Sequence, residues 1–284
     1  MRNHFLRAGG IPSSTDTVTM VSGSPFTTSY QVSDSTDNLD GSFTFTLANV
    51  PTVPKAGKRV AIIHFSYRIG DGDAYANYDN WFKPSNQSGS ATFTLGGSTP
   101  TFRAVGRSRY NSVAVYSMTA DLNTSGSDSN VTFSWDNTSF SPSLNFWGGY
   151  AVAVWIFDYV DTYAILTESE DSDDNTPTSW TLNRSPGGSG SDWTKTLKAV
   201  TAVASNPSTG ISFTKGSGET DTTYTTAIET DIGSSELVET NYAFLDTGSP
   251  TNMTGTASVT FSSPNNDDGI GVAASHIRFK PTSS

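Results

Sequence analysis

The chain has 284 residues, a length that allows one large or two ordinary domains. Its formal net charge of −11 argues against a general nucleic-acid binder, which needs a basic face. Cysteine is absent, which excludes disulfides, thiol nucleophiles and cysteine-ligated metal sites. Charged residues make up only 15% and aromatic residues 12%, so a few large rings can build the core of a chain rich in Ser and Thr. This composition is typical of a β-sandwich or barrel.

The first segment, residues 1–16, is predicted to be an extended arm. It is locally basic, carries two apolar anchors and is loosened by Gly9-Gly10. We interpret it as a peg that docks onto a larger assembly, and the alternative is a frayed terminus. The candidate docking residues are Arg2, His4, Phe5, Leu6 and Arg7. The arm lacks the apolar segment of a secretory signal, so we expect synthesis in the host cytoplasm without a signal peptide.

From Thr17 onward, short hydrophobic alternations predict strands. Ser42–Leu47 places Phe43, Phe45 and Leu47 on one face and hydroxyl groups on the other. Arg59–Tyr67 is apolar on both faces, which predicts a strand covered on both sides. Further strands are expected at 91–95, 113–118 and 130–135.

The longest apolar run of the whole chain contains Tyr150–Phe157. Both of its faces are apolar, so it is predicted to be a buried strand that ends at Asp158. The run is shorter than the roughly 20 residues of a membrane-spanning helix, so we expect no membrane insertion.

The second half of the chain repeats this order of segments. Leu197–Ala204 resembles the strand at Val60, Ser258–Phe261 resembles 130–133, and Gly269–Phe279 resembles Gly149–Phe157. These offsets of about 120 to 140 residues fit one domain length. The fold is therefore predicted to be all-β, with two tandem antiparallel β-sandwich, jelly-roll-like domains at residues 17–160 and 161–284, preceded by the arm.

Two stretches of the second half are predicted to differ from strands. The like-charge run Glu168–Asp174 is expected to be a solvated loop or linker near the domain boundary. Thr223–Ile232 is the one stretch where a short helix is conceivable.

Oxygen-bearing side chains alternate in the stretch Asp71–Asp79, as they often do in calcium loops. The stretch lacks the glycine and the distal glutamate of an EF-hand, so a polar hairpin loop is the preferred interpretation, and calcium binding stays open. The three histidines are scattered, and no nucleophile elbow or phosphate-binding loop is present. No catalytic residue, metal or cofactor is predicted. A pair of carboxylates for glycoside hydrolysis stays open, because the distance between such residues is set in space and not by their spacing in the sequence.

Aromatic residues in a predicted loop form a candidate exposed patch: Tyr75, Tyr78 and Trp81. Such rings can stack on sugars, and packing within the loop is the alternative interpretation. Arg103, Arg107 and Arg109 form the one basic cluster outside the arm, suited to an acidic partner or to local charge balance.

The chain resembles tandem β-sandwich virion surface proteins, of the decoration or fibre type, from tailed and especially marine bacteriophages and prophages. The resemblance covers most of the chain and lies in its pattern. It includes the arm around Phe5–Gly9, the Phe93–Gly97 segment, and a Val-Thr-Phe strand followed by a Gly-rich apolar strand, at Tyr150–Val154 and Ile270–Ala274. It implies no catalytic residues.

What the resemblance implies is a non-enzymatic structural protein on the virion surface, as a capsid decoration or a tail or fibre attachment protein. Its expected partners are other virion proteins of the capsid or tail, further copies of itself in a homo-oligomer, and surface glycans, but no nucleic acid. The alternative is a carbohydrate-binding module that recognises host or environmental glycans through the loop aromatics. A third possibility, a polysaccharide-cleaving enzyme, would need two carboxylates in one cleft.

Overall fold

The structure is a computed structural model, and it describes a set of segments that together form the body of the protein. The segments are residues 17–30, 42–47, 57–68, 92–108, 113–122, 131–136, 149–172, 179–182, 193–204, 211–215, 224–232, 237–246, 257–261 and 270–282. Within them are sixteen strands and no helix, so the prediction of an all-β fold is confirmed. A helix long and apolar enough to cross a membrane does not occur in these segments.

Nine strands lie on the predicted hydrophobic segments, namely β3, β4, β5, β7, β8, β9, β11, β15 and β16, and the other seven are not predicted individually. In the first half they are β1 (Thr19–Met20), β2 (Phe26–Tyr30), β3 (Ser42–Leu47), β4 (Lys58–Arg68), β5 (Thr92–Leu95), β6 (Thr101–Ser108), β7 (Val113–Leu122) and β8 (Val131–Asp136). The long strand β9 (Tyr150–Ser172) follows. In the second half they are β10 (Ser179–Leu182), β11 (Lys195–Ala204), β12 (Ile211–Lys215), β13 (Thr225–Asp231), β14 (Leu237–Asp246), β15 (Ala257–Phe261) and β16 (Ile270–Pro281).

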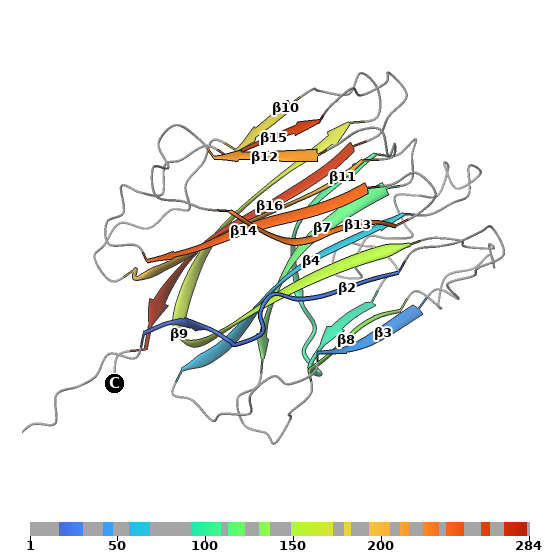
Figure 1. The fold of residues 1–284 in the computed structure, drawn as a ribbon. Helices are drawn as coiled ribbons and strands as arrows, with labels where there is room; N and C mark the ends of the chain where they lie inside the picture. Colours follow the sequence, from blue (N-terminus) through green and yellow to red (C-terminus); the bar gives the residue numbers. More distant parts are fainter. Residues whose placement is uncertain are drawn as a thin grey trace, which may run out of the picture.

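The strands form one large and two small antiparallel sheets. The large sheet has ten strands in the order β13-β14-β11-β16-β9-β4-β7-β6, with β1 and β2 also paired to β9. The small sheets are β3-β8-β5 and β10-β15-β12. Figure 1 shows the two small sheets on opposite outer sides of the large one, so the molecule is layered.

The strand pairing of the first half recurs in the second half. Adding seven to each strand number turns β2-β9-β4-β7-β6 into β9-β16-β11-β14-β13, and β3-β8-β5 into β10-β15-β12. The β-bulge recurs as well, because Arg103 is the extra residue of β6 opposite β7, and Ala227 is that of β13 opposite β14. Each set of eight strands divided between a large and a small sheet is a jelly roll.

We call these sets the first repeat (β2–β8 with Tyr150–Asp158 of β9) and the second repeat (Val160–Ser172 of β9 with β10–β16). Strand β9 belongs to both. Its first part pairs with β2 and β4, and its second part pairs with β16 from Val160 to Ser172. The last strand of the first repeat thus continues directly as the first strand of the second repeat.

This continuity corrects two expectations. The strand at Tyr150 does not end at Asp158, and the loop expected at Glu168–Asp174 is wrong for Glu168–Ser172, which are part of β9. The physical reason is that the backbone of these residues pairs with Ile270–Ala274 of β16, which outweighs the repulsion between like charges. The stretch Thr223–Ile232, considered for a helix, contains the edge strand β13 instead.

The long apolar strands are buried on both faces because the two halves of the large sheet pack against each other. Side chains from both repeats meet in this middle layer: Val60, Ile62, Ala153, Trp155, Phe157, Leu197, Ala199, Ile277 and Phe279. The opposite faces of the same strands pack against the small sheets, for example Phe65 against Phe133, and Val200 in one cluster with Ile211. The two-sided burial predicted for the strands at Arg59 and Tyr150 is confirmed.

Strand β9 changes from one repeat to the other at Tyr159, whose φ is 64°. This is the left-handed region, in which a β-branched residue is strongly disfavoured and asparagine is tolerated. The backbone oxygen of Tyr159 accepts hydrogen bonds from the N–H group and the hydroxyl of Thr282.

We expect Tyr159→Val to lower the free energy of unfolding by about 1 to 3 kcal/mol more than Tyr159→Asn, because both lose the ring but only valine strains the turn. Chemical denaturation of the two variants measures the difference. Equal stabilities would show that the turn at residue 159 tolerates any side chain.

Candidate functional site

Most residues selected from the sequence lie outside the described residues. These are the docking arm (Arg2, His4, Phe5, Leu6, Arg7), the aromatic patch (Tyr75, Tyr78, Trp81) and the possible calcium stretch Asp71–Asp79. Their roles stay predictions. Among the described residues, no group of three or more His, Asp or Glu side chains is placed to hold a metal ion.

Of the predicted basic cluster, Arg103 and Arg107 lie in β6, and side-chain contacts are described for Arg103. Its Nε donates to Oγ1 of Thr119 at 2.9 Å, and its Nη2 lies 3.5 Å from the hydroxyl of Tyr163. Thr167 in turn donates to the backbone oxygen of Arg103. Arg103 therefore ties the bulge of β6 to the second part of β9, which is an internal role.

A buried network of five polar side chains lies in the middle layer between the repeats. Nδ1 of His64 is 2.8 Å from Oγ1 of Thr201, and Nε2 is 2.9 Å from Oγ of Ser275. Each partner is bound to a second hydroxyl group, Ser275 to Ser117 and Thr201 to Thr240 at 2.8 Å. We call these five side chains the joint, because β4 and β7 of the first repeat supply two and β11, β14 and β16 of the second repeat supply three.

The joint follows the internal repeat. His64 is paired with Ser117 in the β4–β7 ladder, and Thr201 is paired with Thr240 in the β11–β14 ladder. Ser117 and Thr240 each lie opposite the first residue after the bulge, so they are equivalent positions, as are His64 and Thr201. One equivalent pair, His64 and Thr201, therefore meets across the middle layer, and the position of Ser275 corresponds to that of Trp155 in the first repeat.

A hydroxyl group beside an imidazole is the arrangement of a nucleophile and its base. Here Ser275 is 0% exposed and His64 1%, and no carboxylate orients the ring. A substrate could not reach this pair without separating the sheets. The arrangement is suited to holding the repeats together, and its burial places His64 in the core.

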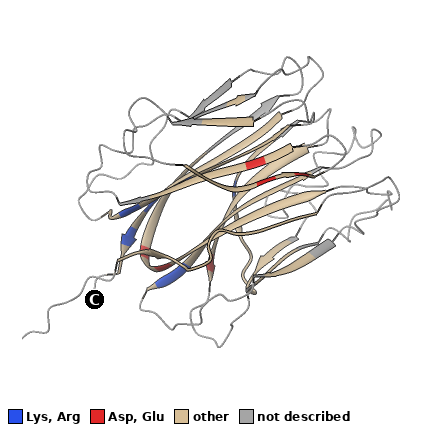
Figure 2. Ribbon diagram, in the orientation of Figure 1, with Lys and Arg blue, Asp and Glu red and all other residues tan. Residues whose placement is uncertain are grey.

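The environment of the joint is apolar and aromatic. His64 meets the ring of Trp155 edge to face at a centroid distance of 5.3 Å, and Trp155 meets Tyr242 at 5.7 Å. Figure 2 shows that the strands crossing the middle of the molecule carry few charged residues. This burial lowers the pKa of His64 from 6.5 to about 3, so the ring is neutral at physiological pH.

The repeats differ in the charges on the opposite faces of the same strands. The second repeat buries Lys198, His276 and Arg278, and burial lowers the pKa of Lys198 to about 8. In the first repeat, a bidentate ion pair is buried instead, with Arg59 Nε 2.7 Å and Nη2 3.0 Å from the two carboxylate oxygens of Asp158.

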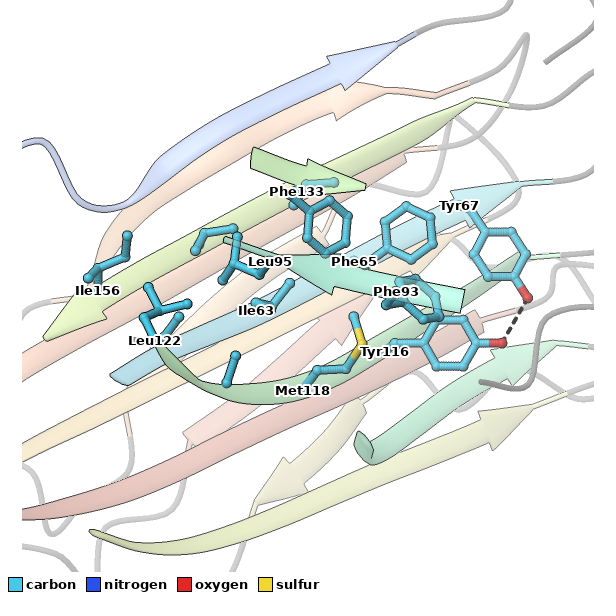
Figure 3. Close-up of a cluster of buried hydrophobic side chains, with 14 of the residues drawn as sticks. Ile63, Phe65, Tyr67, Phe93, Leu95, Tyr116, Met118, Leu122, Phe133 and Ile156 are labelled. Atoms are coloured by element: carbon cyan, nitrogen blue, oxygen red, sulfur yellow. Dashed lines mark hydrogen bonds between the residues drawn. The ribbon is translucent and has the colours of Figure 1, made fainter. Parts of the chain in front are cut away.

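Aromatic side chains gather at the end of the first repeat where β4 ends. Figure 3 shows Phe65, Phe93 and Phe133 packed together beside Tyr67 and Tyr116, whose hydroxyl groups lie 3.1 Å apart. At the same end of the sheet Tyr30 and Tyr150 are half-buried and stacked, with a centroid distance of 6.0 Å. The segment that contains Tyr75, Tyr78 and Trp81 leaves β4 at this end, directly after Arg68.

Comparison of the chain with protein-family models, with curated proteins and with solved structures finds no match. The functional argument therefore depends on the fold and on the contacts described above.

Sequence reasoning selects no residue of the joint. The sequence nevertheless contains a signal for two of its residues, His64 and Thr201. The similarity between Leu197–Ala204 and the strand beginning at Val60 already aligns Thr201 with His64. What the sequence does not contain is the packing of these two strands on each other. A polar residue at the same place in both copies of an otherwise apolar strand would be the signal for such an interface.

Proposed function

We propose that this chain is a non-enzymatic structural protein of a bacteriophage virion, located on the particle exterior as part of the capsid surface or of a tail or fibre. The observation that carries the proposal is the doubled jelly roll, joined by one continuous strand and a dry middle layer. Jelly rolls build viral capsid and lectin domains.

Two further properties support a structural role. The nucleophile-and-base geometry among the described residues is sealed between sheets. The repeats share a sheet instead of being joined by a linker, which suits a component that must hold its shape in an assembly. Its equivalent faces meet within one chain, so contacts with other virion proteins or with further copies would use the outer surfaces and the arm.

The proposal is tested by locating the protein in phage particles. We expect immunogold labelling against the chain to decorate intact particles, with label on the head or on the tail deciding between the two placements. Mass spectrometry of gradient-purified particles should detect the 30.2 kDa chain at many copies per particle. Intact particles without the chain, or label only on disrupted particles, would overturn the proposal.

Docking through the arm gives a separate prediction. Deletion of residues 1–14 should release the protein from particles without unfolding it, because the described sheets begin only at Thr19. Co-sedimentation with particles measures attachment, and circular dichroism of the purified variant checks its fold. The matched control is a variant in which Arg2 and Arg7 alone are replaced by serine, and we expect partial loss of attachment. A fully attached deletion variant would contradict docking by the arm.

The alternative, a carbohydrate-binding module, is favoured by one observation, the half-buried Tyr30–Tyr150 stack at the end of the sheet where β4 ends. Stacked rings of this kind can bind sugars through their faces. A glycan array distinguishes the two functions. Binding that is lost in Trp81→Ala and in Tyr150→Ala would favour the module, and no binding by the intact protein would remove it.

A further inference from the structure

His64 lies between the two repeats and bridges them through both of its ring nitrogens. The ring is supplied by the first repeat, and both of its nitrogens are bound by hydroxyl groups of the second repeat, Thr201 and Ser275. We propose that His64 is an acid-responsive lock: the neutral ring closes the joint, and protonation of the ring loosens the packing of the two repeats. This inference goes beyond the proposed function and does not depend on it.

The hydrogen bonds of the joint fit a neutral ring. A neutral imidazole donates from one nitrogen and accepts at the other. In one consistent arrangement Ser117 donates to Ser275 and Ser275 donates to Nε2 of His64. Nδ1–H of His64 then donates to Thr201, and Thr201 donates to Thr240. An imidazolium donates from both nitrogens, so Ser275 and Thr201 must both accept, and the hydroxyl groups on both sides must point away from the ring.

Reorientation of hydroxyl groups does not compensate the new charge. The described residues that face the ring from the packed strands are Ser117 and Thr119 of β7, Ala153 and Trp155 of β9, Ala199 and Thr201 of β11, Thr240 and Tyr242 of β14, and Ala273 and Ser275 of β16. None is acidic, and the one titratable group among them is Tyr242, whose pKa is raised by burial. The charged group next to them, Arg103 of β6 bonded to Thr119, is itself positive and cannot compensate a second positive charge. A positive charge here has no counter-ion among them, and its burial is strongly unfavourable.

The direction of the pH effect follows from this burial. The pKa of His64 is about 3 in the closed joint and 6.5 in the exposed ring. Between these values the opened or unfolded chain binds a proton that the closed joint does not. The contribution of His64 to the free energy of unfolding is constant above about pH 6.5. Below that pH, the free energy of unfolding falls as the pH decreases toward 3.

The first test compares unfolding by guanidinium chloride at two pH values in the wild type and in His64→Gln, whose amide can donate and accept but does not titrate. From about pH 7.5 to about pH 5, the unfolding constant of the wild type should rise roughly thirtyfold more than that of the variant. Equal pH dependence in both proteins would overturn the proposal, because carboxylates would then account for the whole effect.

The second test uses the wild type alone and remains decisive if the variant fails to fold. Nitrogen chemical shifts of the imidazole, measured by NMR, should show a neutral ring in the folded protein down to about pH 4. Titration of His64 with an ordinary midpoint near 6.5 while the protein stays folded would overturn the proposal.

Discussion

Replacing Gly106 by alanine is expected to lower the free energy of unfolding by about 3 kcal/mol or more. A Cβ atom at residue 106 would lie 2.0 Å from the backbone oxygen of Val272 and 2.5 Å from its nitrogen and carbonyl carbon. Gly106 is in β6 of the first repeat and Val272 is in β16 of the second, so the two backbones must move apart. Side-chain rotation cannot relieve this clash, because the opposing atoms belong to the main chain.

Gly149→Ala should have a comparable effect for the same reason, since its Cβ would lie 1.6 Å from the backbone oxygen of Ile232. The matched control is Thr101→Ala, at an exposed position of β6, which we expect to change stability by less than about 0.5 kcal/mol. Denaturant titrations of the three variants measure the differences. Full stability of Gly106→Ala would mean that the repeats do not approach each other as closely as described.

Removing one partner of the Arg59–Asp158 pair is expected to cost about 3 to 5 kcal/mol, because the remaining charge stays buried without compensation. Both side chains are 9% exposed, and the pair is bidentate. The pair links β4 to β9 just before the turn at Tyr159. Asp158→Ala therefore removes the carboxylate at the point where the chain passes from one repeat to the other.

The double variant Arg59→Met, Asp158→Leu provides the control. We expect it to be more stable than either single variant, because apolar groups of similar volume replace a buried ion pair at little cost. The exposed pair between Lys58 and Asp121 is the surface comparison, and Lys58→Ala should cost less than about 1 kcal/mol. Additive single and double effects would contradict the account of the Arg59–Asp158 pair.

The sequence predicts nine of the sixteen strands individually and their assembly less well. Strands such as β4 and β7 are readable because their apolar residues continue on both faces, which indicates layers on each side. The internal repeat is also readable, through Leu197–Ala204 and the strand at Val60. Neither signal predicts which face of a strand packs against the small sheet and which packs against the other repeat, because both contacts need the same apolar side chains.

The course of β9 illustrates the limit. Charge repulsion in Glu168–Asp174 and the polar residue Asp158 both favour the end of a strand when judged locally. Pairing with β16 keeps Glu168–Ser172 in the strand, and the ion pair with Arg59 accommodates Asp158 within it. Each of these partners lies about a hundred residues away in the chain. Local patterns carry no information on such partners.

The central claim is that the two repeats form one body, sharing a strand and the buried joint, and differential scanning calorimetry at neutral pH tests it most directly. Chains with two independent domains usually unfold in separate steps. We predict a single transition for the intact protein, with a calorimetric enthalpy equal to the van't Hoff enthalpy. Two resolved transitions, each with the enthalpy of about half the chain, would contradict the account.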